Sequence, residues 1–197
     1  MSESSSVRVA IISAAHRADA QSLRIANSLN EQFLGGEASI VDLYAADLPM
    51  WTGTAPTPAV EAVRATLTAA DALIIVAPEW HGMAPAGLKN LLLWCGAAEL
   101  AHKPVLLVAV SGSVGGAFVI AELRGSGYKN SRMLYTPEHL ILRGVSDLWS
   151  GKDHPSDEFL CKRARFAVDQ LLTYATALKP VRGQLVEGMA EFANGMS

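Results

Sequence analysis

The chain has 197 residues, half of them hydrophobic and 18% charged, with a formal net charge of -3. This length suits a single domain, and the apolar fraction is enough for a packed core, which excludes a wholly disordered chain. The charge lacks the basic excess of a nucleic-acid-binding protein, so we expect no nucleic-acid partner. The longest apolar runs, 72–77 and 104–110, are far shorter than the roughly 20 residues of a membrane-spanning helix, so we expect no membrane span.

The N-terminal residues and the cysteines indicate the compartment. Residues 1–6 carry neither the basic start nor the apolar core of a secretion signal, and we expect them to be disordered. Cys95 and Cys161 are far apart, and the sequence contains no Cys-x-x-Cys pair and no Cys/His cluster with zinc-binding spacing. We therefore expect no metal site and a cytoplasmic location.

Strand-like and helix-like segments alternate along the chain. Apolar β-branched runs predict strands, and apolar residues at helical spacing predict helices. In chain order we expect a strand at 7–12, a helix at 22–33, a strand at 38–42, a proline-rich loop at 48–58, a helix at 59–70, a strand at 72–77, a helix at 86–95, a strand at 105–110, a helix at 117–123, a strand at 139–142 and a helix at 157–177. The alternation predicts an α/β fold, a three-layer sandwich around a five-stranded parallel sheet.

The last predicted helix has an apolar stripe, and the segment beyond it has no clear pattern. We expect this helix to bury its stripe against the sheet; the stripe consists of Phe159, Ala164, Val168, Leu171 and Leu172. Residues 180–197 give no prediction of secondary structure.

Three strand-to-helix turns are the candidate site, because ligands bind outside the carboxyl ends of parallel strands. These turns are 13–21, 78–85 and 111–116. The first leads into a helix start, whose free N–H groups attract phosphate. Arg17 adds a cation there, and Gln21 and Ser22 add donors; the alternative is a solvated turn in which Ser22 caps the helix. The chain has neither G-x-G-x-x-G nor a P-loop sequence at this turn, which disfavours a dinucleotide-binding Rossmann fold and a P-loop NTPase.

The second turn carries the most specific pattern. Residues 78–83 are Pro-Glu-Trp-His-Gly-Met, followed by Pro85 and by Leu-Lys-Asn at 88–90. This turn resembles that of the NAD(P)H-dependent FMN reductase family, which has the flavodoxin-like fold and carries Pro-Glu-Tyr-Asn-Gly-Ser, then Pro and a Leu-Lys-Asn helix. Trp80 stands where tyrosine is usual and His81 where asparagine is usual. The resemblance implies that the flavin ring contacts Pro78, Glu79, Trp80, His81, Gly82 and Met83.

The other two turns extend the same resemblance. The first turn is similar to the family's Ser-Gly-Ser-x-Arg-x-x-Ser-x-Ser phosphate loop, with Ala15 and Ala20 where serine is usual. There the resemblance implies FMN contacts from Ser13, Arg17, Gln21 and Ser22. The third turn resembles the family's glycine-rich second flavin loop, which implies contacts to the pyrimidine edge of the ring from Ser111, Gly112, Ser113, Gly115 and Gly116.

The resemblance spans residues 7–142 and implies a function. It points to an FMN-dependent NAD(P)H oxidoreductase that passes electrons from NADPH or NADH to a quinone, a flavin or a similar small acceptor. It further implies a flavodoxin-like FMN-binding domain at 7–178, followed by a C-terminal tail at 179–197. We expect no catalytic side chain, because FMN carries the hydride chemistry, and we interpret Glu79 as structural. The family and the apolar surplus of the chain indicate a homodimer or homotetramer, and we expect 86–95 and the tail at 180–197 to bury apolar surface against another subunit.

Two other functions on the same fold stay open. One is a flavodoxin-like electron carrier, although such carriers are usually more acidic than this chain. The other is a flavin-less binding protein, which the alanines at 15 and 20 favour. A phosphoreceiver domain is excluded, because it needs acidic residues after the first and third strands, where this chain has Ser-Ala at 13–14 and Pro-Glu at 78–79.

Overall fold

The fold is a single parallel sheet between two layers of helices, here taken from a computed structural model that describes residues 6–192. The strands are β1 (Val9–Ser13), β2 (Ser39–Asp42), β3 (Ala72–Pro78), β4 (Pro104–Val110) and β5 (Leu134–Leu142). They lie in the order β2-β1-β3-β4-β5, and all four pairings are parallel. The predicted five-stranded parallel sheet is therefore confirmed. Most of the expected disordered start, residues 1–5, lies outside the described residues.

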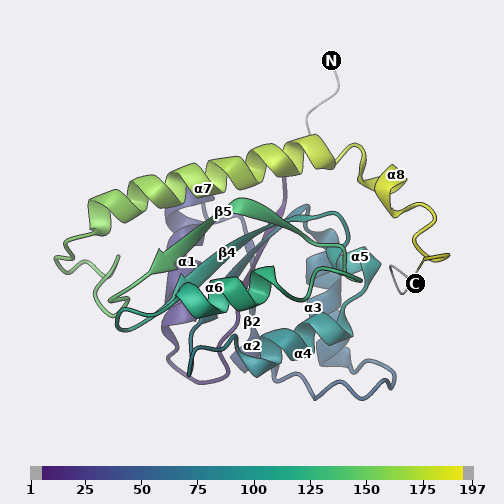
Figure 1. The fold of residues 1–197 in the computed structure, drawn as a ribbon, viewed down its shortest axis with the longest axis horizontal. Helices are drawn as coiled ribbons and strands as arrows, with labels where there is room; N and C mark the ends of the chain where they lie inside the picture. Colours follow the sequence, from purple (N-terminus) through teal and green to yellow (C-terminus); the bar gives the residue numbers. More distant parts are fainter. Residues whose placement is uncertain (1–5, 193–197) are drawn as a thin grey trace.

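Eight helices connect and follow the strands in the described part of the chain. They are α1 (Gln21–Phe33), α2 (Leu43–Ala46), α3 (Pro58–Ala69), α4 (Ala86–Trp94), α5 (Ala97–Leu100), α6 (Ala117–Arg124), α7 (Asp157–Leu178) and α8 (Arg182–Val186). Figure 1 shows α7 as a long helix beside the sheet, with α8 beyond its end. Among the described residues, no helix is long and apolar enough to cross a membrane.

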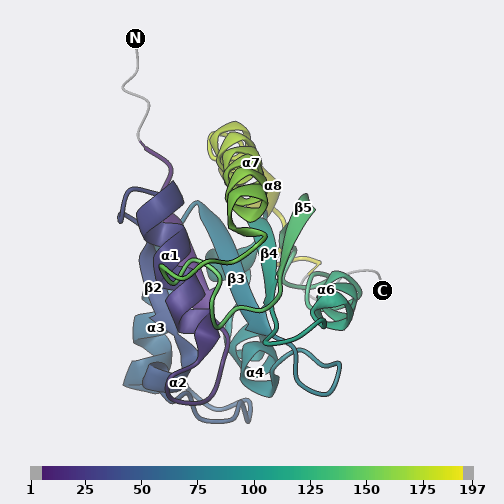
Figure 2. The same cartoon turned by 90° about the vertical axis from the view of Figure 1, so that its left-hand side faces the viewer.

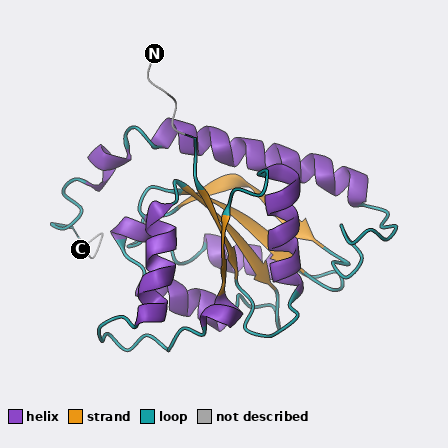
Figure 3. Cartoon of the chain, turned by 180° about the vertical axis from the view of Figure 1, so that it is seen from behind, coloured by secondary structure: helices purple, strands orange, loops and turns teal. Residues whose placement is uncertain are grey.

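Alternating strand residues build two cores, one on each face of the sheet. Leu73 and Ile75 of β3 pack into the core formed with α3, α4 and α6, whereas Ile74 and Val76 pack into the core formed with α1 and α7. Both faces of β3 and β4 are buried along their whole length, which explains their uninterrupted apolar sequences. Figure 2 shows α1 and α6 on opposite sides of the strands, and Figure 3 shows the strands enclosed by helices.

Three short helices are absent from the sequence prediction. Each of α2, α5 and α8 has only four or five residues, which is too short for an apolar period to repeat. Local polar contacts define the first two: the carboxylate of Asp42 accepts from the Tyr44 N–H at 3.4 Å, and that of Glu99 accepts from the Gly96 N–H at 2.7 Å. Capping contacts of this kind do not produce a periodic hydropathy pattern, so the sequence does not predict these helices.

The edge strand β5 is nine residues long, whereas the predicted strand covered only residues 139–142. Its first half contains Pro137, which an edge strand tolerates because the missing N–H faces outward. Val105 pairs with Tyr135 and Leu107 with His139, so three residues of β5 bulge opposite a single residue of β4. The guanidinium of Arg124 donates to the carbonyls of Thr136 and Pro137 at 2.8 and 2.9 Å, so these two carbonyls of the bulged segment have a hydrogen-bond partner.

The apolar stripe of α7 is narrower than the sequence predicted. Ala164, Val168 and Leu171 are fully buried, and Leu172 packs partly against the same core. Phe159 is 64% exposed, so its predicted burial is wrong. Leu160, in the same first turn of α7, packs against the core instead, so Phe159 lies outside the buried stripe.

Asn90 and Trp94 of α4 anchor the proline-rich loop before α3. The amide of Asn90 donates to the Pro49 carbonyl at 2.9 Å and accepts from the Trp51 N–H at 2.7 Å. The indole N–H of Trp94 donates to the same Pro49 carbonyl at 2.9 Å. The asparagine of the Leu-Lys-Asn sequence is thus buried and structural, and Trp94 is buried beside it.

Lys103 is a fully buried cation that caps a helix. Its ammonium donates to the carbonyls of Leu67 and Thr68, at the C-terminus of α3, at 2.5 and 3.2 Å. Burial lowers the pKa of this ammonium to about 8. The last carbonyls of α3 carry the negative end of the helix dipole, which is where a cation is favourable.

This lowered pKa gives a testable dependence of stability on pH. Between pH 8 and 10.5 the folded chain binds fewer protons at Lys103 than the unfolded chain, so this group adds stability as the pH rises. When the pH rises from 7.5 to 10, we expect the free energy of unfolding of the wild type to increase by about 2 kcal/mol more than that of the Lys103→Met variant. Urea unfolding of both proteins at the two pH values measures this, and an equal gain in both would contradict it.

Candidate functional site

The three candidate turns lie together at one edge of the sheet. They follow β1, β3 and β4, which are neighbours in the strand order. From β1 the chain crosses to β2 on one side and returns to β3 on the other, so the ends of β1 and β3 flank a topological switch point. This is the position at which ligands bind in open parallel sheets. The geometry therefore brings the three turns to one place.

The first turn ends at an uncapped helix. Ala20 is the N-cap of α1, the first turn of α1 has no acidic residue, and no side chain of the described residues caps its N–H groups. The alternative in which Ser22 caps the helix is therefore wrong, because Ser22 lies inside α1. The free N–H groups of such a helix start are a ready site for phosphate.

Three of the predicted donors in this turn have protein partners. The hydroxyls of Ser13 and Ser22 are buried and lie 3.4 Å apart, and the Gln21 side chain accepts from Arg24 at 2.8 Å. Arg24 in turn donates to the carbonyls of Val145 and Leu148, which ties the start of α1 to the segment after β5. Arg17 is exposed, and the Gln21 amide NH2 group and the first N–H groups of α1 have no side-chain partner among the described residues.

Arg17 joins the first turn to the second. Its guanidinium carbon lies 5.3 Å from the centre of the Trp80 ring, a cation–π contact between two exposed side chains. Trp80 is 50% exposed at the edge of the sheet, so part of its ring surface is open to solvent. Tryptophan in place of the family's tyrosine provides a larger surface for this contact.

The second turn is a tight hairpin built on two left-handed residues. The N–H of Trp80 donates to the Met83 carbonyl at 3.2 Å, and the N–H of Met83 donates back at 2.9 Å. His81 and Gly82 between them have φ of 52° and 72°, as a type I′ turn requires. Asparagine and glycine are the preferred residues at these positions, and histidine is among the few others that tolerate positive φ. The Asn-Gly of the family and the His-Gly of this chain thus meet the same backbone requirement.

Glu79 links the second turn to the third. Its carboxylate accepts from the N–H of Val119, in the first turn of α6, at 3.1 Å. A β-carbon placed on Gly115 would come within 2.7 Å of the same carboxylate, so a larger residue there would displace the Glu79 side chain. Glu79 caps α6 from a neighbouring turn, which agrees with the structural interpretation of this residue.

Two substitutions separate capping from proton transfer at Glu79. We expect Glu79→Ala to lower the free energy of unfolding by about 1–2 kcal/mol, because it removes a helix cap. Glu79→Gln keeps an acceptor, so we expect a smaller loss and NAD(P)H turnover within about threefold of the wild type, since the cofactor carries the chemistry. Thermal unfolding and steady-state assays check both. A collapse of turnover in Glu79→Gln with unchanged stability would instead indicate an acid–base role.

The glycines of the third turn differ in what surrounds them. Gly116 has φ of 107°, and a β-carbon there would lie 2.6 Å from the Ile141 side chain. Gly112 has no heavy atom within 4 Å of such a β-carbon. Ser113 is exposed, and its N–H donates to the Ser111 hydroxyl at 3.2 Å, which stabilises the turn. The backbone near Gly112 is therefore open to a ligand.

These features fit FMN. The α1 start offers N–H groups and Arg17 for a phosphate, and Trp80 and Met83 expose apolar surface for a ring. Gly112 leaves its backbone accessible for the polar edge of that ring. Fold and site together define a flavodoxin-like flavoprotein.

The chain belongs to a known family of this class. The model of the NADPH-dependent FMN reductase family matches residues 7–146, which is most of the chain. The protein is therefore a member of that family and an NAD(P)H-dependent flavin oxidoreductase. The family resemblance inferred from the three turns is confirmed.

Individual relatives agree with this placement. The chain is 28% identical over 190 residues to an NADPH azoreductase of Bacillus sp. (strain OY1-2), covering 91% of this chain and 98% of that protein. It is 40% identical over 81 residues to a quinone reductase of Escherichia coli (strain K12), covering 39% and 42%. The structure of a flavoenzyme NAD(P)H:(acceptor) oxidoreductase from Paracoccus denitrificans superposes with a TM-score of 0.71 at 21% identity, covering 87% and 98%. That likeness confirms the flavodoxin-like fold.

The sequence prediction missed a small cavity beside the first turn. The cavity has a volume of about 470 Å³ and is lined by residues that include His16, Tyr44, Asp47 and Asn90. His16 lies directly over Gly87 of α4, where a β-carbon would collide with its ring. The sequence does not predict this contact, because an isolated histidine in a turn has no spacing signal and Gly87 lies inside an ordinary helical pattern.

Cys95 is not a reactive group of this site. Burial and the nearby carboxylate of Glu99 raise the pKa of its thiol to about 12. At pH 8 the thiolate is scarce, although a more basic thiolate is intrinsically more nucleophilic. We expect Cys95 in a Cys161→Ser variant to react with iodoacetamide about a hundredfold more slowly than a free cysteine, and to react normally after unfolding in urea. Rapid labelling of the folded variant, measured by mass spectrometry, would contradict this.

Proposed function

We propose that the protein binds FMN across its three turns and uses it to carry electrons from NAD(P)H to a small quinone or azo compound. The observation that carries this proposal is the convergence of an uncapped helix start, an exposed aromatic face and an open glycine turn at one switch point. The names of the azoreductase and quinone reductase relatives support the choice of acceptor.

Each turn has its own part in this proposal. The α1 N–H groups and Arg17 bind the phosphate, with Ser13 and Ser22 holding the turn from beneath. Pro78, Glu79 and residues 80–83 support the ring, and the hairpin at His81 and Gly82 fixes where that support lies. When bound, FMN supplies the hydride chemistry.

The third turn would complete the site electrostatically. Backbone N–H groups of residues 111–116 face the pyrimidine edge of the ring, where reduction adds negative charge. Glu79 holds α6 and hence the end of this turn in place. The chain therefore binds, orients and tunes the cofactor without a catalytic side chain of its own.

The assembly and location form part of the same proposal. We infer a homodimer or homotetramer, which the family and the high apolar fraction of the chain support. We infer a cytoplasmic location, in line with two free cysteines and a nicotinamide substrate. Sedimentation velocity of the purified protein tests the assembly.

A spectroscopic titration tests the function. The purified protein is saturated with FMN, the unbound flavin is removed, and NADPH or NADH is added without oxygen. We expect bleaching of the flavin absorbance, followed by recovery on adding benzoquinone or a neutral azo dye. Failure to retain FMN would overturn the proposal, and slow bleaching by both nucleotides would point to the electron carrier instead.

A further inference from the structure

A large cavity lies away from the three turns. It has a volume of about 1360 Å³, and α4, α5, the segment 126–132 and the C-terminal segment 178–190 line it. None of the predicted flavin contacts is among its lining residues. Its apolar part includes Leu92, Leu93, Val186 and Met189, from α4 and the C-terminal segment. We call it the tail groove.

The charges of the tail groove are unbalanced. Five lysine and arginine side chains and His102 line it, against only two carboxylates. Both carboxylates already have cationic partners: Asp71 accepts from Lys179 at 2.9 Å, and Glu122 pairs with Lys89. The groove therefore has a local positive excess in a chain whose overall charge is -3.

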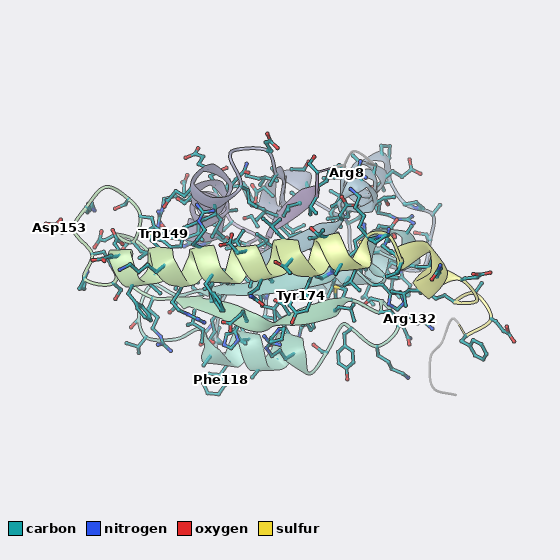
Figure 4. All side chains as sticks on the ribbon, turned by 90° about the horizontal axis from the view of Figure 1, so that it is seen from above. Arg8, Phe118, Arg132, Trp149, Asp153 and Tyr174 are labelled. Atoms are coloured by element: carbon teal, nitrogen blue, oxygen red, sulfur yellow. The ribbon has the colours of Figure 1, made fainter. Side chains whose placement is uncertain are left out.

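Three cations account for this excess. Lys129, Arg132 and Arg182 take part in none of the ion pairs formed by residues 6–192. Arg182 donates to the Ala98 and Ala101 carbonyls, each at 2.8 Å, and Arg132 donates to the Asn130 and Phe192 carbonyls. Carbonyls satisfy these donors but do not neutralise their charge. Figure 4 shows Arg132 beside the C-terminal segment.

His102 lies close enough to Arg132 and Arg182 for their charges to act on its ring. Burial, and then the charges of Arg132 and Arg182, lower the pKa of its ring. Cations gathered at one apolar groove repel one another unless an anion compensates them. An anionic group bound there would relieve this repulsion, and the apolar wall would bury a hydrocarbon or aromatic body.

We propose that the tail groove is a second ligand site, separate from the flavin site, that binds a small organic anion with an apolar body. The anionic group meets Lys129, Arg132 and Arg182, and the apolar body packs against Leu92, Leu93 and Met189. The volume exceeds that of most small-ligand pockets, so an aryl sulfonate or a medium-chain carboxylate has room.

Calorimetric titration of the FMN-saturated protein with 1-naphthalenesulfonate tests this site. We expect saturable binding of one probe per chain with the flavin absorbance unchanged. Lys129→Gln and Arg132→Gln should each weaken binding by about tenfold, because each removes one charged contact. Lys152→Gln is the matched control, since this exposed lysine pairs with Asp147 outside the groove, and we expect no change.

Each result of this titration either supports or overturns the proposed second site. Lys129 is exposed and makes no bond among the described residues, so its variant folds even if Arg132→Gln does not. Absence of saturable binding overturns the proposal, including the case in which a second copy of the chain covers the groove. Equal binding by the wild type and Lys129→Gln overturns it too, as does displacement of FMN by the probe, which would place the probe in the flavin site.

Discussion

Replacing Gly116 with alanine is expected to lower the free energy of unfolding by about 3 kcal/mol. The residue has φ of 107°, where an L side chain is strained, and its β-carbon would lie 2.6 Å from Ile141 and 3.4 Å from Ala109. Ile141 belongs to β5 and Ala109 to β4, so neither can move without disturbing the sheet. For a chain of this length the loss corresponds to a fall in melting temperature of roughly 10 °C.

Gly112 supplies the matched control four residues earlier. It has no positive φ and no heavy atom within 4 Å of a built β-carbon. We expect Gly112→Ala to change stability by no more than about 0.5 kcal/mol. Differential scanning calorimetry of both FMN-free variants makes the comparison. Equal melting temperatures for Gly116→Ala and the wild type would show that the third turn relaxes freely, contrary to this account.

Gly112→Val is expected to reduce FMN affinity by about 10- to 100-fold while leaving the unfolding of the FMN-free protein unchanged. The position is open in the structure, so the valine meets no protein atom. In the proposed site the ring edge approaches the backbone here, and a branched side chain would occupy that space. The expected loss corresponds to roughly 1.4–2.8 kcal/mol of binding free energy.

Quenching of FMN fluorescence on binding measures this affinity. Gly183→Val serves as control, because Gly183 is another glycine with open surroundings and no positive φ, and it lies in α8 away from the turns. We expect FMN to bind this control as it binds the wild type. Unaltered FMN binding by Gly112→Val would place the flavin elsewhere than across the third turn.

The second turn illustrates how much a short motif predicts. Pro78, Glu79 and Gly82, followed by Pro85 and Leu-Lys-Asn at 88–90, carry the most specific part of the resemblance to the family. The reason for the glycine became clear only from φ of 72° at that position, paired with 52° at His81. The reason for the glutamate lies 40 residues away, at the N–H of Val119. Such long-range partners follow from tertiary structure and not from local pattern.

The sequence determined the alternation of elements, because an apolar period reports burial wherever an element is long enough for the period to repeat. The strands β3 and β4, the helices α1 and α7, and the order of the three turns followed from it. Elements set by few polar contacts, namely α2, α5, α8 and the bulged half of β5, required the folded chain. Tertiary structure alone turned Ser13 and Ser22 toward each other, set Arg17 against Trp80 and gathered Arg132 and Arg182 around the tail groove. The last two of these depend on segments far apart in the chain, whose approach the packing of helices on the sheet decides.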